Sequence, residues 1–122
     1  MNVEAPFWLF LCRQPPYGSA WAGACMEFLM TAAAFDRRVV LAFAGDGVHH
    51  LRAGQDATGL GLKDLSRALP ALELYEVKDV VAEAAALRAR GIGEDNMVIP
   101  AQAVETNALA ELMRRADQVF VF

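Results

Sequence analysis

Apolar and polar positions follow one another along the chain in blocks that each have the length of one strand or helix. Short apolar runs rich in Val, Ile, Leu or Phe predict strands, and these are Phe7–Cys12, Arg38–Phe43, Val77–Ala82, Met97–Ala101 and Gln118–Phe122. The segments between them predict helices, and these are Ser19–Phe35, Leu62–Leu72, Glu83–Arg90 and Glu105–Ala116. Because strands and helices alternate, we expect an α/β domain with a mainly parallel five-stranded sheet covered by helices on both faces.

The helix predicted over Ser19–Phe35 is apolar around most of its circumference. It carries a single charge, at Glu27, and it is slightly short for a bilayer, which needs about 20 predominantly apolar residues. A helix of this kind requires burial on two sides. We therefore expect the sheet to cover one side and Met26, Met30 or Phe35 to face another subunit, the alternative being small Ala residues on an exposed face.

Two further segments raise separate expectations. The last predicted strand, Gln118–Phe122, is apolar, and an uncovered apolar strand at a sheet edge invites aggregation, so we expect it to lie inside the sheet or to be covered. The stretch Gly45–Gly61 is rich in glycine and predicts a surface loop with a short helical turn. Loops of this length are often functional.

Composition restricts the classes of protein that the chain can represent. The 122 residues can bury roughly two-thirds of their unfolded surface, so we expect one domain over residues 1–122. The net charge of −4 argues against direct nucleic-acid binding, which requires a basic surface. Two cysteines without a CxxC pair, together with no secretory leader and no membrane segment, favour a reduced, cytoplasmic location.

The end of the first predicted strand is the main candidate for chemistry, because ligands gather beyond the carboxyl ends of strands in open α/β sheets. Cys12 ends this strand and Arg13 follows it. The arginine would favour the thiolate, so Cys12 is a candidate nucleophile or persulfide carrier. The alternative is a small buried hydrophobic residue that completes the strand, and this is the role expected for Cys25 inside the apolar helix.

The turn after Cys12 offers a weaker candidate site, for an anion. Arg13, Gln14 and the backbone amides around Gly18–Ala20 lie where the next helix begins, and helix N-termini attract negative charge. However, Pro15 and Pro16 lack backbone N–H groups, so the turn is expected mainly to position the helix.

Three other positions carry chemistry-bearing side chains at predicted element ends. His49 and His50 could ligate a metal, but no second Cys or His cluster completes a site, so we expect surface polar residues and no metal. Asp46 has the place of a phosphate acceptor in signalling receivers, yet the acidic cluster and the final Lys of such proteins are missing. Glu83 begins a helix, where the helix dipole stabilises a carboxylate.

Three segments resemble the DsrE/DsrF-like family, and they are closest to its TusC/DsrF branch. They are Arg13-Gln14-Pro15-Pro16-Tyr17-Gly18, then Gly45-Asp46-Gly47-Val48 with Leu51 and Gly54-Gln55, and then Ala86-Leu87-Arg88-Ala89-Arg90-Gly91. The resemblance runs over nearly the whole chain. It implies a three-layer α/β/α fold, an intracellular location and a role as a sulfur-relay subunit.

The resemblance also implies which residue should carry sulfur. Sulfur-carrying members of the family place a reactive cysteine about eight residues before the Arg-Gly that closes the third helix, and here that position falls near Glu83. A carboxylate cannot accept sulfane sulfur, so the resemblance implies a non-catalytic companion subunit that needs no cofactor. By analogy, its partners would be TusB-like and TusD-like chains in a heterohexamer that passes sulfur onward for 2-thiolation of the tRNA wobble uridine.

Two alternatives remain open on the residues themselves. The chain could be an active thiol carrier through Cys12, perhaps as a homo-oligomer with its own donor. It could instead be a small-ligand-binding α/β module that uses the loop Gly45–Gly61.

Overall fold

The computed structural model describes residues 5–17, 20–54 and 65–122, apart from the side chains of residues 22 and 65–68. Its strands are β1 (Trp8–Cys12), β2 (Val39–Phe43), β3 (Asp79–Glu83), β4 (Gln102–Val104) and β5 (Gln118–Val121). Its α-helices are α1 (Trp21–Ala34), α2 (Ala84–Ala89) and α3 (Thr106–Arg115), and its 3₁₀ segments are η1 (Gly45–Leu51), η3 (Leu65–Tyr75) and η4 (Glu94–Asn96). None of the helices in these ranges is long and apolar enough to cross a membrane.

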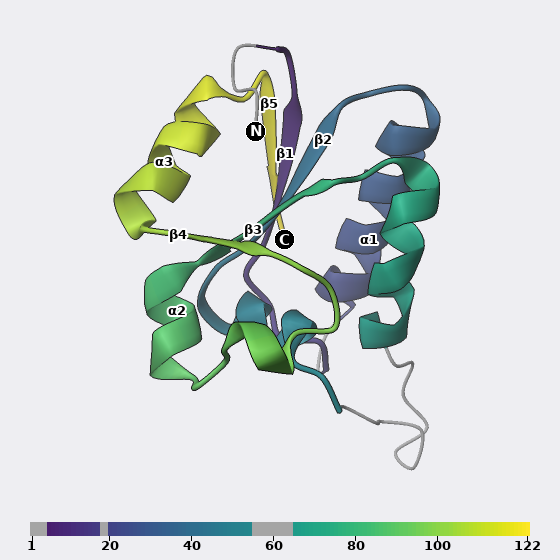
Figure 1. The fold of residues 1–122 in the computed structure, drawn as a ribbon. Coiled ribbons are helices and arrows are strands. Elements are labelled where there is room, and N and C mark those ends of the chain that lie inside the picture. Colours follow the sequence, from purple (N-terminus) through teal and green to yellow (C-terminus); the bar gives the residue numbers. More distant parts are fainter. Residues whose placement is uncertain (1–4, 18–19, 55–64) are drawn as a thin grey trace.

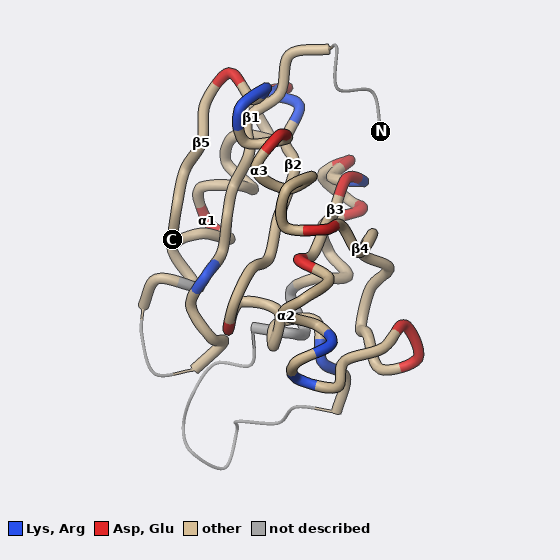
Figure 2. Tube along the Cα trace, turned by 90° about the vertical axis from the view of Figure 1, so that its left-hand side faces the viewer, with Lys and Arg blue, Asp and Glu red and all other residues tan. Residues whose placement is uncertain are grey.

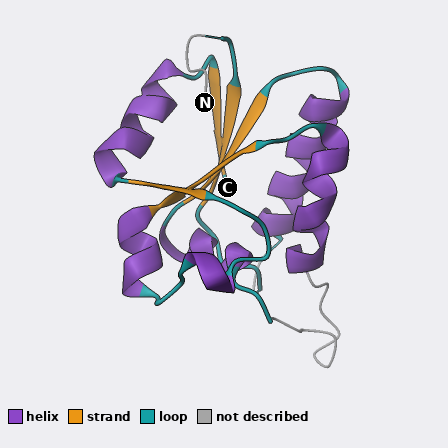
Figure 3. Cartoon of the chain, in the orientation of Figure 1, coloured by secondary structure: helices purple, strands orange, loops and turns teal. Residues whose placement is uncertain are grey.

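The strands form one five-stranded sheet in the order β4-β3-β2-β1-β5, and every neighbouring pair is parallel (Figures 1 and 3). The register places Cys12 beside Phe43, so β1 and β2 end together. This arrangement confirms the predicted α/β fold class and puts the loops that follow β1, β2 and β3 at one edge of the sheet.

Alternation along the strands separates two apolar layers. Phe10 and Cys12 belong to the layer shared with α1 and η3, whereas Leu9 and Leu11 belong to the layer shared with α3. Figure 1 shows α1 and η3 on one face of the sheet and α3 on the other. The expected three-layer α/β/α architecture is therefore confirmed, and Cys12 points into the α1 layer.

One predicted strand is wrong. Met97–Ala101 was expected to pair in the sheet, but β4 starts only at Gln102. Met97 instead forms an antiparallel bridge with Arg52, and the amide of Val98 donates to the carbonyl of Leu51 at 2.8 Å. The apolar run thus packs against the end of η1, and the short strand that follows it pairs with β3.

A line of exposed aromatic side chains runs along α1, and one of them, Phe28, also packs against Phe122 with ring centroids 5.9 Å apart. Trp21, Phe28 and Phe35 are 58%, 60% and 78% exposed, and their seven-residue spacing places them along one side of the helix. The expectation that Phe35 is available to another subunit agrees with this exposure. The same expectation is wrong for Met26, which is buried against the sheet because it lies on the opposite side.

One of the two expectations for the last strand was that it lies inside the sheet, and this expectation is wrong. β5 pairs with β1 and is the end strand in the sheet order, and Val121 is 54% exposed. The residues on either side of Val121 are nevertheless covered. The rings of Phe120 and Phe122 stack on the ring of Phe10, with centroids 4.9 and 6.4 Å from it, respectively. Aromatic stacking anchors this edge while its outer side stays open among the residues described.

The predicted loop Gly45–Gly61 begins with a short helical turn, as expected, but this turn does not lie on the surface. It forms η1, in which Gly47, Val48, His50 and Leu51 are buried. A Cβ atom at Gly47 would clash with the backbone carbonyl of Cys12, so only glycine lets η1 pass this close to the end of β1. Residues 55–61 of the predicted loop, and residues 62–64 of the next predicted helix, lie outside the described part of the chain.

Candidate functional site

Cys12 and His50 form a buried pair at the carboxyl end of β1. Each side chain is 2% exposed, and Cys12 Sγ lies 3.4 Å from His50 Nε2. The contact depends on Gly47, because its missing side chain lets η1 cross the end of β1 and turn His50 inward. The ring of His50 also stacks on Phe43, with centroids 5.5 Å apart.

A backbone carbonyl determines which nitrogen of His50 carries a proton. Nε2 lies 3.0 Å from the oxygen of Gln14, and a carbonyl oxygen can only accept, so Nε2 bears the hydrogen. The same N–H group is within hydrogen-bond reach of Cys12 Sγ. His50 therefore donates toward the sulfur, which stabilises a thiolate rather than removing the thiol proton through this atom.

Cys25, on α1, completes a group that we call the Cys12 cluster, consisting of Cys12, Cys25 and His50. Hydrogen bonds from the Cys25 thiol and from His50 lower the pKa of Cys12 to about 5, although burial acts in the opposite direction. The pKa of Cys25 is raised well above its usual range, because its proton is held by the Cys12 sulfur and because the thiol is buried. Of the two sulfurs, Cys12 is therefore the one whose thiolate form is favoured.

The turn after β1 does not have the role that was predicted for Arg13, which was to favour the Cys12 thiolate. Arg13 is exposed, and its backbone N–H donates to the carbonyl of Phe122 at 2.7 Å. The groups that lower the pKa of Cys12 are Cys25, His50 and the backbone of Gln14, and the expected contribution of Arg13 is not among them. The predicted anion cradle falls partly outside the described residues, because it includes Gly18 and Ser19.

Glu83 lies at the predicted helix start and joins three elements. It is the last residue of β3 and immediately precedes α2. Its Oε1 accepts from the amide of Gly45 at 3.2 Å, and its Oε2 accepts from the hydroxyl of Thr106 at 3.0 Å. Because Gly45 follows β2 and Thr106 begins α3, both carboxylate oxygens are used to hold the strand ends together.

Asp46 and Arg90 form an ion pair beside this carboxylate. Arg90 donates to Asp46 Oδ1 through Nη2 at 2.9 Å and through Nε at 3.2 Å, and its own carbonyl accepts from Arg52 at 3.0 Å. Figure 2 shows basic positions gathered near the end of α2. Asp46 is therefore engaged in an ion pair with Arg90. This agrees with the sequence analysis, which found no pattern of a signalling receiver around Asp46.

The two adjacent histidines occupy different surroundings. His49 is partly exposed, and desolvation and the nearby Arg52 and Arg90 lower its pKa. His50 is buried, so its prediction as a surface residue is wrong. The contact between His50 and Cys12 could not be predicted from the sequence. The one available signal was Gly47, because a glycine can mark a close backbone approach. Among the described residues, no three His, Cys, Asp or Glu side chains are grouped to hold a metal.

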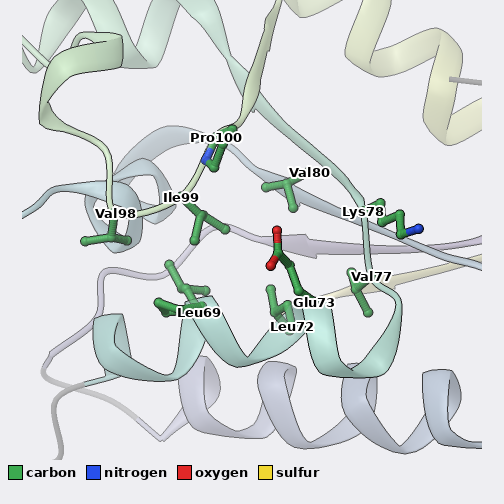
Figure 4. A pocket seen from close by; sticks show the side chains of 10 residues that line it. Leu69, Leu72, Glu73, Val77, Lys78, Val80, Val98, Ile99 and Pro100 are labelled. Carbon is green, nitrogen blue, oxygen red and sulfur yellow. The ribbon is translucent and has the colours of Figure 1, made fainter.

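A separate cavity of about 340 Å³ lies between η3 and the segment before β4 (Figure 4). It is lined mainly by apolar side chains, with Glu73 and Lys78 among them, and the others are Leu69, Pro70, Leu72, Val77, Val80, Val98, Ile99 and Pro100. None of these residues belongs to η1, although the amide of Val98 donates to Leu51 at the end of η1.

Comparison with known proteins covers almost the entire chain. A model described as the DsrE/DsrF-like family matches residues 8–122. The "Intracellular sulfur oxidation protein DsrF" of Allochromatium vinosum is 33% identical, with 100% of both chains covered. A "Protein TusC homolog" of Pseudomonas aeruginosa is 33% identical over 91% of this chain and 93% of that protein. The crystal structure of the YchN protein from E. coli shares the fold, with a TM-score of 0.80 at 18% identity, covering 97% of this chain and 100% of that chain.

Proposed function

The chain belongs to the DsrE/DsrF-like family, and from that premise we propose that it is a subunit of an intracellular sulfur-relay complex in which it acts as a structural partner. The names of two relatives, an intracellular sulfur oxidation protein and a TusC homolog, support the relay. The observation that carries the structural role is Glu83 at the start of α2.

Glu83 lies near the position at which sulfur-carrying members of the family are expected to hold a reactive cysteine, and no cysteine is close to it in the sequence. Its carboxylate contains no sulfur and cannot form a persulfide. Both of its oxygens accept hydrogen bonds, from Gly45 and from Thr106, so the side chain is committed to joining β2, β3 and α3. In this subunit the helix start therefore supports the fold, and sulfur is carried by a partner.

The aromatic line on α1 supports assembly with other chains. Trp21, Phe28 and Phe35 together expose more apolar surface than isolated surface residues do. We propose TusB-like and TusD-like chains as the partners in a hetero-oligomer, with a homo-oligomer as the alternative. The sulfur passed by the complex would be used for 2-thiolation of the tRNA wobble uridine, without direct RNA binding by this acidic chain.

Co-expression with TusB-like and TusD-like chains tests the assembly. Light scattering after size-exclusion chromatography should give one complex that contains this chain, and Phe28→Glu should release it. Ala110→Glu is the matched control, because Ala110 is exposed on α3, which lies on the other face of the sheet (Figure 1), and it should leave the complex intact. A chain that stays monomeric with every partner would refute the proposal.

The Cys12 cluster favours a second candidate function, a thiol carrier. His50 donates to the Cys12 sulfur at 3.4 Å, which suits a nucleophilic thiolate. A carrier would gain the mass of one sulfur atom on Cys12 after incubation with a persulfide donor. Peptide mass spectrometry that finds no added sulfur on Cys12 would exclude this function.

A further inference from the structure

The cavity between η3 and the segment before β4 has no role in the proposed partnership, and the path of that segment creates it. β4 begins at Gln102, which pairs with Val81, so no strand lies beside the first two residues of β3 on this side. The segment before β4 is held instead at the end of η1. The space beside Val80 is bounded by η3 and, opposite it, by Ile99 and Pro100 (Figure 4).

The walls of this cavity are mainly apolar, and one carboxylate points into it. Leu69 and Leu72 form a buried apolar wall on η3. Figure 4 shows the side chain of Glu73 reaching from η3 across the cavity toward Val80, whereas the amino group of Lys78 points away from it. The charge that faces the interior of the cavity is therefore negative.

The carboxylate of Glu73 is also available to a ligand. Within the described part of the chain, Glu73 forms neither a hydrogen bond nor an ion pair. Asp79, in the adjoining hollow at the start of β3, differs in this respect, because it pairs with Arg38 at 3.2 Å. An ionised carboxylate only accepts hydrogen bonds, so its ligand must present a donor, and a positively charged donor binds it best.

We propose that this cavity binds a small organic ammonium ion with an apolar body. The ammonium group donates to the Glu73 carboxylate, and the apolar body covers Leu72, Val80 and Ile99 in place of water. The volume of about 340 Å³ lies at the lower end of the range for small-ligand cavities, roughly 300–1,000 Å³. An anionic ligand of the same size is rejected, because its charge would face the Glu73 carboxylate.

Three probes that share a phenyl ring and a four-carbon chain test the charge preference. They are phenylbutylamine, phenylbutanol and phenylbutyrate, which at pH 7 are a cation, a neutral molecule and an anion. Each is titrated into the full-length chain, and methyl NMR signals of Val80, Val98 and Ile99 are followed. The amine should shift these signals and saturate with a dissociation constant of roughly 1 mM or tighter, as its size allows. The alcohol should bind about tenfold more weakly, because it lacks the charged hydrogen bond to a partly exposed carboxylate.

Substitutions assign the preference to Glu73. Glu73→Gln keeps the size of the side chain and should weaken binding of the amine about tenfold, while binding of the alcohol stays the same. Lys78→Gln is the matched control, because Lys78 lines the same cavity with its amino group turned away, and it should change binding of the amine by less than about twofold. Ile99→Trp fills the cavity and should abolish binding of both probes. The three probes on the wild type remain decisive even if Ile99→Trp folds poorly.

The proposal is overturned by any of four results. They are no saturation by the amine at ten times the expected dissociation constant, shifts confined to residues outside the cavity, equal affinity of the wild type for the amine and the alcohol, and equal losses of amine binding in Glu73→Gln and Lys78→Gln. All of these readouts use the isolated chain and involve no sulfur transfer. Their outcome is therefore independent of whether the chain assembles in a sulfur relay.

Discussion

Gly47 is the residue on which the Cys12 cluster depends most directly. Its backbone passes so close to the Cys12 carbonyl that no side chain fits, and this approach brings His50 over the sulfur. Glycine here is required by packing, whereas Gly45 is required by its positive φ of 53°. The two positions that flank Asp46 thus require glycine for different physical reasons.

Gly47→Ala tests this contact. The added methyl group must displace backbone of β1, so we expect the free energy of unfolding to fall by about 1–3 kcal/mol, as for overpacked sites. Urea denaturation measures the change. Gly93→Ala is the control, since no atom lies within 4 Å of its Cβ position, and it should change stability by less than about 0.5 kcal/mol. Equal effects of the two substitutions would contradict the close approach.

Cys12 should make stability depend on pH. Folding lowers its pKa from 9.0 to about 5, so between these values the unfolded chain binds more protons than the folded chain. Stability should therefore rise from pH 5 to pH 9, by at most about 1.4 kcal/mol per pH unit, and the contribution is lost as pH falls through 5. Cys25 acts in the opposite direction near the upper end of this range, because its raised pKa keeps it protonated in the folded chain while it begins to ionise in the unfolded chain.

Chemical denaturation at several pH values checks this slope. In Cys12→Ser the increase in the free energy of unfolding between pH 5 and pH 9 should be smaller than in the wild type. Cys25→Ser should reduce it less, because its hydroxyl can still donate to the Cys12 sulfur. A slope that is identical in the wild type and in Cys12→Ser would rule out a stabilised thiolate.

At the scale of elements, Glu83 joins parts of the chain that the sheet alone does not connect. It ends β3 and accepts from the backbone after β2 and from the first residue of α3. A helix of only six residues such as α2 has little stability of its own, so its attachment depends on such contacts and on burial of Leu87.

Glu83→Ala should lower the free energy of unfolding by about 1–3 kcal/mol, because it leaves the Gly45 amide and the Thr106 hydroxyl without this acceptor. Hydrogen exchange should show faster exchange in α2 than in β1. Glu94→Ala, which changes an exposed carboxylate at the start of η4, should have little effect on either measurement. Unchanged exchange in α2 would show that Glu83 does not secure the helix.

Element types were largely predictable from the sequence, whereas some pairings were not. The apolar runs of β1, β2 and β3 are long and buried on both faces, so their pattern has one interpretation. Met97–Ala101 has the same composition but packs on the end of η1, and periodicity does not distinguish a strand in a sheet from an apolar segment over a 3₁₀ turn. Only the tertiary structure separates these two cases.

At the scale of the whole molecule, the candidate site was predicted in part. Cys12 was identified because the carboxyl ends of strands collect functional groups, but its partners come from elements 13 and 38 residues away, as the positions of Cys25 and His50 in the chain show. His50 follows another histidine and has no apolar neighbour pattern that indicates burial. Its inward position is fixed by the path of η1 over Gly47, which a linear pattern does not contain.

The overall arrangement separates the surfaces available for assembly from the Cys12 cluster. Trp21, Phe28 and Phe35 are exposed along α1, whereas Cys25, one turn after Trp21, is only 1% exposed. A partner that covers Trp21 and Phe28 would thus leave the cluster inside this chain.

The most direct test of the structural role is the location of sulfur in a reconstituted complex. The chain is combined with TusB-like and TusD-like partners, a persulfide donor is added, and every subunit is analysed by intact-mass spectrometry under non-reducing conditions. We expect this chain to remain in the complex and to gain no sulfur, while a partner gains the mass of one sulfur atom. Added sulfur on this chain, retained in Cys25→Ser and lost in Cys12→Ser, would contradict the account.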